Sequence, residues 1–474
     1  MNKKFLNDIF QNKNSSIIIK SISALHIVKL HSLFTKKDYK VLSILFKIFY
    51  RVIFFIIYFL GNLITKKKKE KKILKKKILV ISHIINANHL NAKSDFYYGN
   101  LENFFKKMNK SYCKLMINHT KYSSSYLNHK NKHKNSIILD KNLNIRTEIK
   151  IFIKKIISVF RLIFLLLEQK LNFKEFFLLV ISLFDSATTF TIRINYQIKN
   201  YVKKIKPDYC ILTHEGYSWE RMCINGAKSV NSKIQCIGYQ HTPVTDNHQA
   251  IFKHMSGDFN PDKIWCSQLN SYKILKRKIY RQLKKNIFFI GSLKKEKINL
   301  LGNKNKQTVL VIPEGIYSEC ENLFKFSLVL AKKYEKLKFI WRVHPVIDFE
   351  KVLKNLKLKR TKLPKNIIFS SKKFDEDASK SKYVIYKGSA AVIKSVLMGN
   401  YPIYFKSNKE NIFDPLKNLF NKKNYVSDDK DFFNLLNKVK SKKYKKELKD
   451  NIEFLKKNDF SSPNLRVIKN HLSN

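Results

Sequence analysis

The feature that most constrains this chain is a repeated alternation of short apolar runs with helical segments. Runs such as ILVISHI (Ile78–Ile84) and KIQCIGYQ (Lys233–Gln240) are apolar along most of their length and are bounded by polar turns. Strands that are apolar on both faces are typical of parallel sheets covered by helices on each side. Because strand and helix patterns repeat at the spacing of βαβ units, the sequence predicts an α/β fold.

The alternation occurs in two sets, which predicts two doubly wound, Rossmann-like domains facing each other across a cleft. A chain of 474 residues is too long for one ordinary core, which also favours two domains. The parts we expect are a basic helical leader over 1–75, a first α/β domain over 76–294 with a helical insertion over 145–205, a linker over 295–306, a second α/β domain over 307–430, and C-terminal helices over 431–474.

The chain is strongly basic, with a formal charge of +59 from 94 Lys and Arg against 35 Asp and Glu. Such a charge raises the possibility of a nucleic-acid partner. However, nearly all the basic residues are Lys, and Arg is the side chain that reads phosphates and bases through paired hydrogen bonds. Only 11 Gly and 9 Pro occur beside abundant Asn, Ile and Phe, so the charge reflects a bias of the whole chain. We therefore expect no nucleic-acid partner, and a basic nucleic-acid-binding protein stays as an alternative.

Two apolar regions lie next to basic residues and suggest a membrane partner. The first, Val41–Thr65, precedes the polybasic run Lys66–Lys77, and the second is Ile151–Phe184. The uninterrupted run Val52–Leu60 is too short to span a bilayer. We expect peripheral attachment to the anionic inner face of the cell membrane, facing the cytoplasm. The alternatives are core helices beside a solvated charge run, or a spanning segment.

The sequence predicts no metal site and no bound cofactor. The six cysteines show no metal-ligand spacing, and several lie in apolar runs, which predicts buried free thiols in a reducing compartment. The acidic triplet Asp375–Asp377 is interpreted as the start of a helix. Glycine-rich motifs for dinucleotides and the P-loop are missing, which argues against a dinucleotide enzyme or a P-loop ATPase.

Polar and ionisable residues recur where the predicted strands end. In open parallel sheets, ligands bind at the carboxyl ends of the strands, so these residues are the candidate site. On the first domain they are Asp95, His83, Gln240, His241 and Glu215, and on the second they are Glu314, Arg342, His344, Gly388 and Ser389.

Each candidate residue has a chemical role that its type and position permit. Glu215 could take a proton from an acceptor hydroxyl, with Asp95 as a rival base, or it could be a cap of the helix near Ser218. Arg342 would supply a fixed charge to a diphosphate, and His344 would act as an acid or a hydrogen-bond donor, unless it is a structural histidine.

The remaining candidates divide between the donor and the substrate side. Gly388 and Ser389 open a predicted helix, where free amides attract phosphate, although plain capping by Ser389 is the alternative. Glu314 would hold a ribose or sugar hydroxyl. Together with Asp95, the strand-end residues His83, Gln240 and His241 are expected to bind substrate.

With these residues in place, the chain resembles the GT-B glycosyltransferases. The pairs His344-Pro345, Gly388-Ser389 and Glu215-Gly216 resemble motifs of bacterial capsule and surface-polysaccharide transferases. These include the polysialyltransferases, the capsule Kdo transferases and the CDP-glycerol glycerophosphotransferases. The stretch His214–Val244 is also similar to surface carbohydrate biosynthesis proteins. The resemblance covers roughly residues 77–425.

The resemblance implies a metal-independent transfer of sugar from a nucleotide-sugar, with CMP-sugars slightly favoured, to a surface polysaccharide or lipid-linked glycan. It implies that Glu215 is the base, that His344 binds the donor phosphate or protonates the leaving group, and that Ser389 holds the nucleotide phosphate. The chain departs from the pattern by having His214 at the place of a first acid, and Ala390 where a second Ser is usual. Transfer of a polyol phosphate from a CDP-alcohol by the same fold is the alternative.

Overall fold

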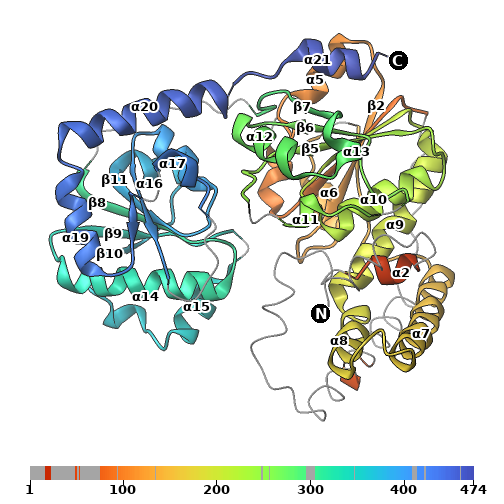
Figure 1. Cartoon of the computed structure of the whole chain (residues 1–474), viewed down its shortest axis with the longest axis horizontal. Helices are drawn as coiled ribbons and strands as arrows, with labels where there is room; N and C mark the ends of the chain where they lie inside the picture. The colour runs from red at the N-terminus through yellow and green to blue at the C-terminus, as the bar shows by residue number, and fades with distance from the viewer. Residues whose placement is uncertain are drawn as a thin grey trace.

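The structure is a computed structural model in which two α/β domains lie side by side (Figure 1). It describes residues 16–22, 49–50, 53 and 75–473, apart from 93, 134, 247–248, 256, 295–304, 346, 408–413, 421–422 and 460. Most of the predicted leader over 1–75, including most of Val41–Thr65 and of the polybasic run, therefore lies outside the described residues. Most of the predicted linker over 295–306 lies outside them as well.

The first domain is built on a parallel sheet with the strand order β3-β2-β1-β4-β5-β6-β7. Its strands are β1 (Ile78–Ile84), β2 (Tyr112–Asn118), β3 (Ser136–Ile138), β4 (Tyr209–Thr213), β5 (Gln235–Gln240), β6 (Lys263–Cys266) and β7 (Ile287–Phe289). The helices that follow these strands are η2 (Ala87–Asn91), α5 (Leu101–Lys107), α6 (Ser124–Lys130), α10 (Ser218–Lys228), α11 (Gln249–Phe252), α12 (Leu269–Lys278) and α13 (Arg281–Lys284).

Both faces of this sheet are buried, as the continuous apolar runs predicted. Leu79 and Ile81 of β1 pack into one core with residues of α10, whereas Ile78 and Val80 pack into another with residues of α5. Successive strand side chains point to opposite faces, so a strand between two helical layers must be apolar at nearly every position.

The insertion predicted over 145–205 forms three helices, α7 (Ile145–Leu167), α8 (Phe173–Leu183) and α9 (Ser186–Ile205). Asn144 caps the start of α7, and Asn172 with Glu175 forms a capping box at the start of α8. A short helix, α2 (Ile17–Lys20), packs against α7. Among the described residues no single helix has the length and hydropathy to cross a bilayer, although the bent pair of α8 and α9 meets both measures together.

The second domain contains a parallel sheet with the order β10-β9-β8-β11-β12-β13. Its strands are β8 (Asn305–Ile312), β9 (Lys338–Trp341), β10 (Ile367–Phe369), β11 (Ser381–Tyr386), β12 (Tyr401–Phe405) and β13 (Tyr425–Val426). The helices are α14 (Tyr317–Lys333), α15 (Phe349–Asn355), η3 (Arg360–Lys362), α16 (Phe374–Lys380), α17 (Ala391–Leu397), α18 (Lys417–Phe420) and α19 (Asp429–Lys438). The predicted fold class, two doubly wound parallel α/β domains, is confirmed.

The C-terminal helices connect the two domains. The long helix α20 (Lys442–Asn458) runs along the second domain, and α21 (Leu465–His471) packs on the first (Figure 1). The indole Nε1 of Trp265 donates to Nδ1 of His471 at 2.9 Å, and the amide of Ser292 donates to the carbonyl of Ser461 at 2.9 Å. The end of the chain therefore ties its two halves together, which a helical pattern in the sequence does not reveal.

Some details of the fold come from the structure and not from the sequence pattern. β3 is a short edge strand of the first sheet. β7 ends at Phe289, and α5 begins at Leu101. All six cysteines are buried and free of disulfides, as predicted.

Candidate functional site

The strand order reverses once in each sheet, between β1 and β4 and between β8 and β11. Such a reversal opens a crevice at the carboxyl ends of the two strands, because their connections leave toward opposite faces. Glu215 follows β4 in the first domain, and Glu314 and Gly388 follow β8 and β11 in the second. Residues singled out in the sequence thus lie at both crevices.

Glu215 is held at the end of β4 by hydroxyl groups. Its Oε1 accepts a hydrogen bond from Thr242 Oγ1 at 2.5 Å, and Tyr217 also hydrogen-bonds to this carboxylate. The side chain is half-buried, so a ligand can reach it. A positioned carboxylate with solvent access meets the geometric requirement for a general base.

A second carboxylate, not predicted as a site residue, shapes the turn that carries Glu215. Glu220 of α10 is buried, and its Oε2 accepts from the backbone amides of Glu215 at 2.7 Å and Tyr217 at 3.0 Å. Burial, and then the charge of Glu215, raise the pKa of Glu220 well above its ordinary value. Glu220 therefore caps α10, whereas Glu215 is not the cap. A glutamate at the third position of a helix is a capping signature that sequence reasoning had available.

Gly216 completes this turn. Its φ is +84°, and a Cβ at this position would lie 2.4 Å from the carbonyl oxygen of Ala250. Only glycine allows the backbone to turn this closely against its neighbour. The Glu-Gly pair recognised in the sequence is therefore a consequence of packing as well as of any chemistry.

Carboxylates from both domains raise the pKa of one side chain, Tyr217. Burial raises the pKa of Tyr217, and the charges of Glu215, Glu220 and Glu314 raise it further. Glu314 belongs to the second domain. The two domains also share a small pocket. Residues 243–246 of the first domain and Ile393 of the second line it.

Histidine and aromatic rings gather beside Glu215 on the first domain. His83 stacks on Tyr97 with a centroid distance of 3.9 Å, and the rings of His119 and Trp219 lie 5.3 and 5.1 Å away. His241 meets the edge of Tyr97 at 5.1 Å. The structure thus brings the predicted substrate residues His83 and His241 together, and it adds His119, Tyr97 and Trp219, which were not predicted.

These imidazoles are neutral at pH 7. Burial lowers the pKa of His119 to about 4, and burial together with Lys294 lowers that of His89 to about 4. Burial also lowers the pKa of His241 to about 4 and that of His83 well below its ordinary value. A neutral imidazole donates one hydrogen bond and accepts another, so the cluster offers both kinds of partner to a ligand.

Several buried polar atoms at this edge have no hydrogen-bond partner in the part of the chain that the structure describes. They include His83 Nε2, His241 Nδ1 and Gln240 Oε1, although Gln240 Nε2 donates to the carbonyl of Thr242. Buried polar atoms are almost always paired in folded proteins, so unpaired ones at a strand edge suggest a place for a ligand. Among the described residues, no three His, Cys, Asp or Glu side chains are arranged to hold a metal ion.

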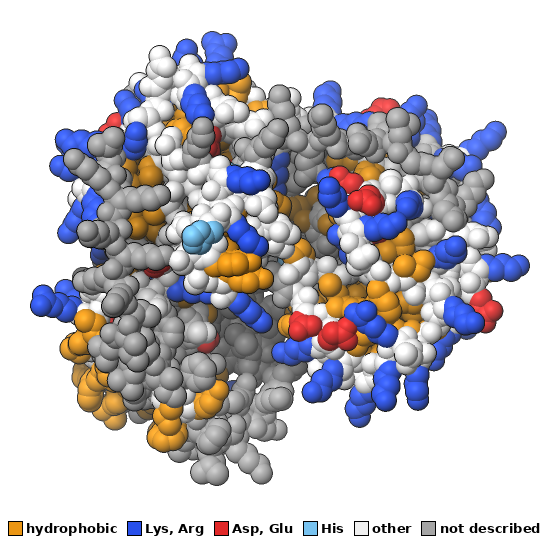
Figure 2. Space-filling model, turned by 180° about the vertical axis from the view of Figure 1, so that it is seen from behind, with side chains coloured by type: hydrophobic (Ala, Val, Ile, Leu, Met, Phe, Trp, Pro, Cys, Tyr) orange, Lys and Arg blue, Asp and Glu red, His pale blue; other side chains and the backbone are white. Residues whose placement is uncertain are grey.

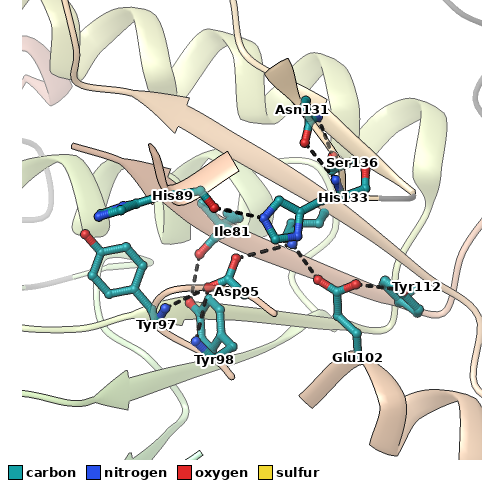
Figure 3. Close-up of polar contacts among 11 residues, drawn as sticks. Ile81, His89, Asp95, Tyr97, Tyr98, Glu102, Tyr112, Asn131, His133 and Ser136 are labelled. Atoms are coloured by element: carbon teal, nitrogen blue, oxygen red, sulfur yellow. Dashed lines mark hydrogen bonds and ion pairs between the residues drawn. The ribbon is translucent and has the colours of Figure 1, made fainter. Parts of the chain in front are cut away.

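Asp95, predicted to contact substrate or act as a rival base, is instead part of a buried network (Figure 3). Its carboxylate accepts from the amides of Tyr97 at 2.8 Å and Tyr98 at 3.1 Å, and it pairs with Lys114 at 3.3 Å. Burial opposes its charge, but Lys114 and the two amides hold its pKa below the ordinary value. Lys114 also contacts Glu102. This arrangement gives Asp95 a structural role, which is to fix the loop that presents Tyr97.

On the second domain, Gly388 and Glu314 pack directly against each other. Gly388 has a φ of +70°, and a Cβ there would lie 2.2 Å from Glu314 Oε2. The neighbouring Lys387 is buried and its Nζ lies 2.8 Å from Glu319 Oε2. α17 begins at Ala391 and has no side-chain cap, so the alternative of plain capping by Ser389 is wrong, and the contact of Ser389 with a phosphate stays a prediction.

Arg342 is already engaged within its own domain. Its Nη1 donates to Asp377 Oδ2 at 2.6 Å, Ser370 Oγ at 2.7 Å and the carbonyl of Lys372 at 2.8 Å. This favours a structural ion pair over the predicted contact with a diphosphate. The interpretation of Asp375–Asp377 as a helix start is confirmed, because these residues form the first turn of α16.

His344 lies in the loop that follows β9, the strand next to β8. It is half-buried, and burial lowers its pKa below the ordinary value. Its position at the carboxyl edge agrees with a ligand-facing residue, and its role stays a prediction.

Comparisons with known proteins give likenesses in structure alone. No protein-family model matches the chain, and no curated protein matches it. A UDP-GlcNAc 2-epimerase from Neisseria meningitidis bound to UDP-GlcNAc has a TM-score of 0.49 and 11% identity, covering 84% of this chain and 100% of that one. The glycotransferase of kitacinnamycin has a TM-score of 0.49 and 10% identity, covering 84% and 99%. The trehalose-6-phosphate synthase OtsA has a TM-score of 0.48 and 11% identity, with the same shares. At these values the likenesses assign neither a family nor an activity to this chain.

Proposed function

We propose that this protein is a GT-B type glycosyltransferase that uses a nucleotide-sugar. The observation that supports this most is the placement of Glu215, which is held by Thr242 at the end of β4, next to the loop 243–246 that lines a pocket between the two domains. A base on one domain and a donor-binding edge on the other is the arrangement that transfer between two substrates requires.

In the proposed reaction, Glu215 takes the proton of an acceptor hydroxyl as its oxygen bonds to the anomeric carbon of the donor sugar. The bond between that carbon and the phosphate oxygen breaks, and the nucleotide leaves with the electron pair. The neutral rings of His83 and His241, with Gln240, bind the acceptor through the polar atoms that have no other partner.

The second domain would hold the donor. Glu314, which packs against Gly388, binds a hydroxyl of the ribose or the sugar, and the free amides at the start of α17 attract the phosphate. His344 donates a hydrogen bond to the leaving phosphate. The proposed chemistry uses no cofactor or metal, and the nucleotide-sugar is a substrate.

The finer assignments rest on the motif resemblance. On that basis we propose CMP-sugars as the first donors to test, and a surface polysaccharide or lipid-linked glycan as the acceptor. Transfer of a polyol phosphate from a CDP-alcohol differs in its product, which would be a phosphodiester.

A donor screen tests the proposal. Thermal unfolding of the full-length protein would be measured with CMP, CDP, UDP and GDP, and the nucleotide that stabilises it would then be tested as its sugar conjugate with glycan acceptors. We expect one nucleotide to raise the unfolding temperature and its sugar to be transferred. No stabilisation by any nucleotide and no transfer would contradict the proposal, and phosphate in the product would favour the CDP-alcohol reaction.

A further inference from the structure

The outer face of α7 carries a continuous apolar ridge. Its large hydrophobic side chains are 37% to 74% exposed and recur at the spacing of one helix face. They are Ile149, Ile153, Ile156, Ile157, Phe160, Ile163, Phe164 and Leu167, and Phe173 at the start of α8 extends the ridge with 70% exposure. Figure 2 shows exposed hydrophobic side chains gathered on the part of the first domain that carries this insertion.

The opposite face of α7 fixes the helix to the domain. Glu148 and Arg193 form a buried ion pair at 2.7 Å, and Lys155 Nζ donates to Thr189 Oγ1 at 2.6 Å. Ile151 and Leu162 are fully buried in the core of the insertion. The other side of the helix packs against α9. The ridge therefore faces outward and is a fixed part of the surface of the folded protein.

The charges around the ridge are basic. Each acidic side chain of the 145–183 segment is tied to the protein itself: Glu148 to Arg193, Glu168 to Lys170 at 2.8 Å, and Glu175 to the cap of α8. The exposed basic side chains beside the ridge are Arg146, Lys150, Arg161 and Lys174. Lys150 and Arg161 fall on one flank of the helix.

We propose that this ridge docks into the surface of an anionic lipid bilayer, with α7 lying in the plane of the interface. Large apolar side chains enter the boundary of the acyl chains while Lys and Arg meet anionic headgroups. A second copy of this chain is a poorer occupant, because two such faces would bring like charges together. The inner side of α7 is packed against α9, which suits a helix that lies on a membrane.

The docking would also orient the candidate site. α9 packs along α10, with Asn195 Nδ2 donating to the carbonyl of Met222 at 2.9 Å and Thr191 Oγ1 lying 3.3 Å from Ser218 Oγ. α10 begins at the turn that holds Glu215, so a rigid path joins the ridge to the cleft. The proposal itself does not depend on which reaction the cleft performs.

Vesicle flotation of the full-length protein tests the ridge. Vesicles of phosphatidylcholine alone and with phosphatidylglycerol would be compared for the wild type and for the double variant F160E/F164E. We expect the wild type to float with the anionic vesicles and the variant to lose at least about tenfold in partition, because charged side chains are costly at the acyl boundary. The flank variant K150E should lose roughly fivefold on anionic vesicles only.

A matched control is Phe433→Glu, since Phe433 is 52% exposed on α19 of the second domain. It should bind vesicles like the wild type. Undiminished binding by F160E/F164E would overturn the proposal, as would equal binding of the wild type to neutral and anionic vesicles. A wild-type dimer that F160E/F164E disperses, without vesicle binding, would assign the ridge to a second copy instead.

A spectroscopic measurement gives an independent answer. The fluorescence that Phe164→Trp adds should be quenched by brominated lipids, and the fluorescence that Phe433→Trp adds should not. Lack of quenching at 164 in protein that floats with vesicles would show that another part of the chain binds the membrane.

Discussion

The carboxyl edges of the two sheets differ in how their polar groups are satisfied. In the first domain, buried atoms of His83, Gln240 and His241 have no partner among the described residues. In the second domain the charged groups pair with one another, as Lys387 does with Glu319 and Arg342 with Asp377. The first edge has polar atoms available for a ligand beside Glu215, whereas the predicted site residue Arg342 and the neighbouring Lys387 of the second edge are held in internal pairs.

From the pairing of side chains we expect the first edge to respond to a ligand and the second to be rigid without one. Internal ion pairs hold the second edge in one geometry, so substitutions there should appear first in stability. The first edge lacks such pairs around Glu215, so substitutions there should appear first in activity.

The substitution Glu215→Gln should have the largest effect and falls on the first edge. It keeps the size of the side chain and a hydrogen-bond acceptor for Thr242 but removes the base. We expect kcat for transfer to fall roughly 10²- to 10⁴-fold with a smaller change in KM and in the unfolding temperature. Initial rates with the nucleotide-sugar found in the donor screen measure this.

Glu453→Gln is a suitable control, because Glu453 is exposed on α20 and distant in sequence from both edges. Its rates should match the wild type. Wild-type kcat in Glu215→Gln would remove this residue from the chemistry.

The substitution Lys387→Met should show the opposite pattern on the second edge. It leaves Glu319 buried without its cation, and breaking a buried pair typically costs about 3–5 kcal/mol of unfolding free energy. The double variant K387M/E319L should recover part of this loss. Denaturant unfolding followed by tryptophan fluorescence measures the stability of both variants.

The exposed pair of Lys423 and Glu447 provides the control. The variant K423M should change the free energy of unfolding little. Equal stability of Lys387→Met and wild type would contradict the contrast between the edges.

The fold was predictable because its signal is local and repeated. Ile78–Ile84 and Tyr209–Thr213 are apolar on both faces, and this pattern follows directly from burial between two layers of helices. The positions of strand ends then follow from the same pattern, which is why His83, Glu215, Glu314 and His344 were found at the carboxyl edges.

The partners of the site residues were not predictable, because they come from distant segments. Asp377 lies 35 residues from Arg342, and Lys114 lies 19 residues from Asp95. Residue type and strand position make Arg342 and Asp95 attractive ligands for substrate, and only the fold shows that each already has an ionic partner. The start of α17 was misplaced for a more local reason, since the helix begins two residues after Ser389.

The next prediction separates backbone strain from side-chain packing at the second edge. In Gly388→Ala the added Cβ would lie 2.2 Å from Glu314 Oε2, and the position also has a positive φ. In Gly257→Ala, at a φ of +78°, the added Cβ would contact only the ring of Phe259, at 3.9 Å. We expect about 1–2 kcal/mol of lost unfolding free energy at Gly257 and about 1–3 kcal/mol more at Gly388. Denaturant unfolding measures the difference, and equal losses would show that Glu314 moves aside without cost.

The smallest effect we expect is a difference in acid stability between the domains. The first domain holds several imidazoles whose pKa burial lowers, to about 3 for His214 and to about 4 for His241. Each binds its proton near pH 6.5 in the unfolded chain but only at those lower values when folded. Between them the unfolded state holds more protons, so the free energy of unfolding of the first domain falls as the pH is lowered from 6.5 toward 4.

Burial raises the pKa of Glu220 in the first domain and of Asp414 in the second. Each of these carboxyl groups binds its proton more readily in the folded state, so each opposes the loss of stability as the pH falls. The histidines therefore set the difference, which we expect to be about one pH unit or less between the two acid midpoints. Trp265 and Trp341 are fully buried reporters of the first and second domains, and variants that keep one of them as the single tryptophan, with Trp219 also replaced, allow each midpoint to be followed by fluorescence. A second-domain midpoint at the same pH or higher would mean that the unpaired imidazoles of the first edge cost little, and that the contrast between the edges is confined to their ion pairs.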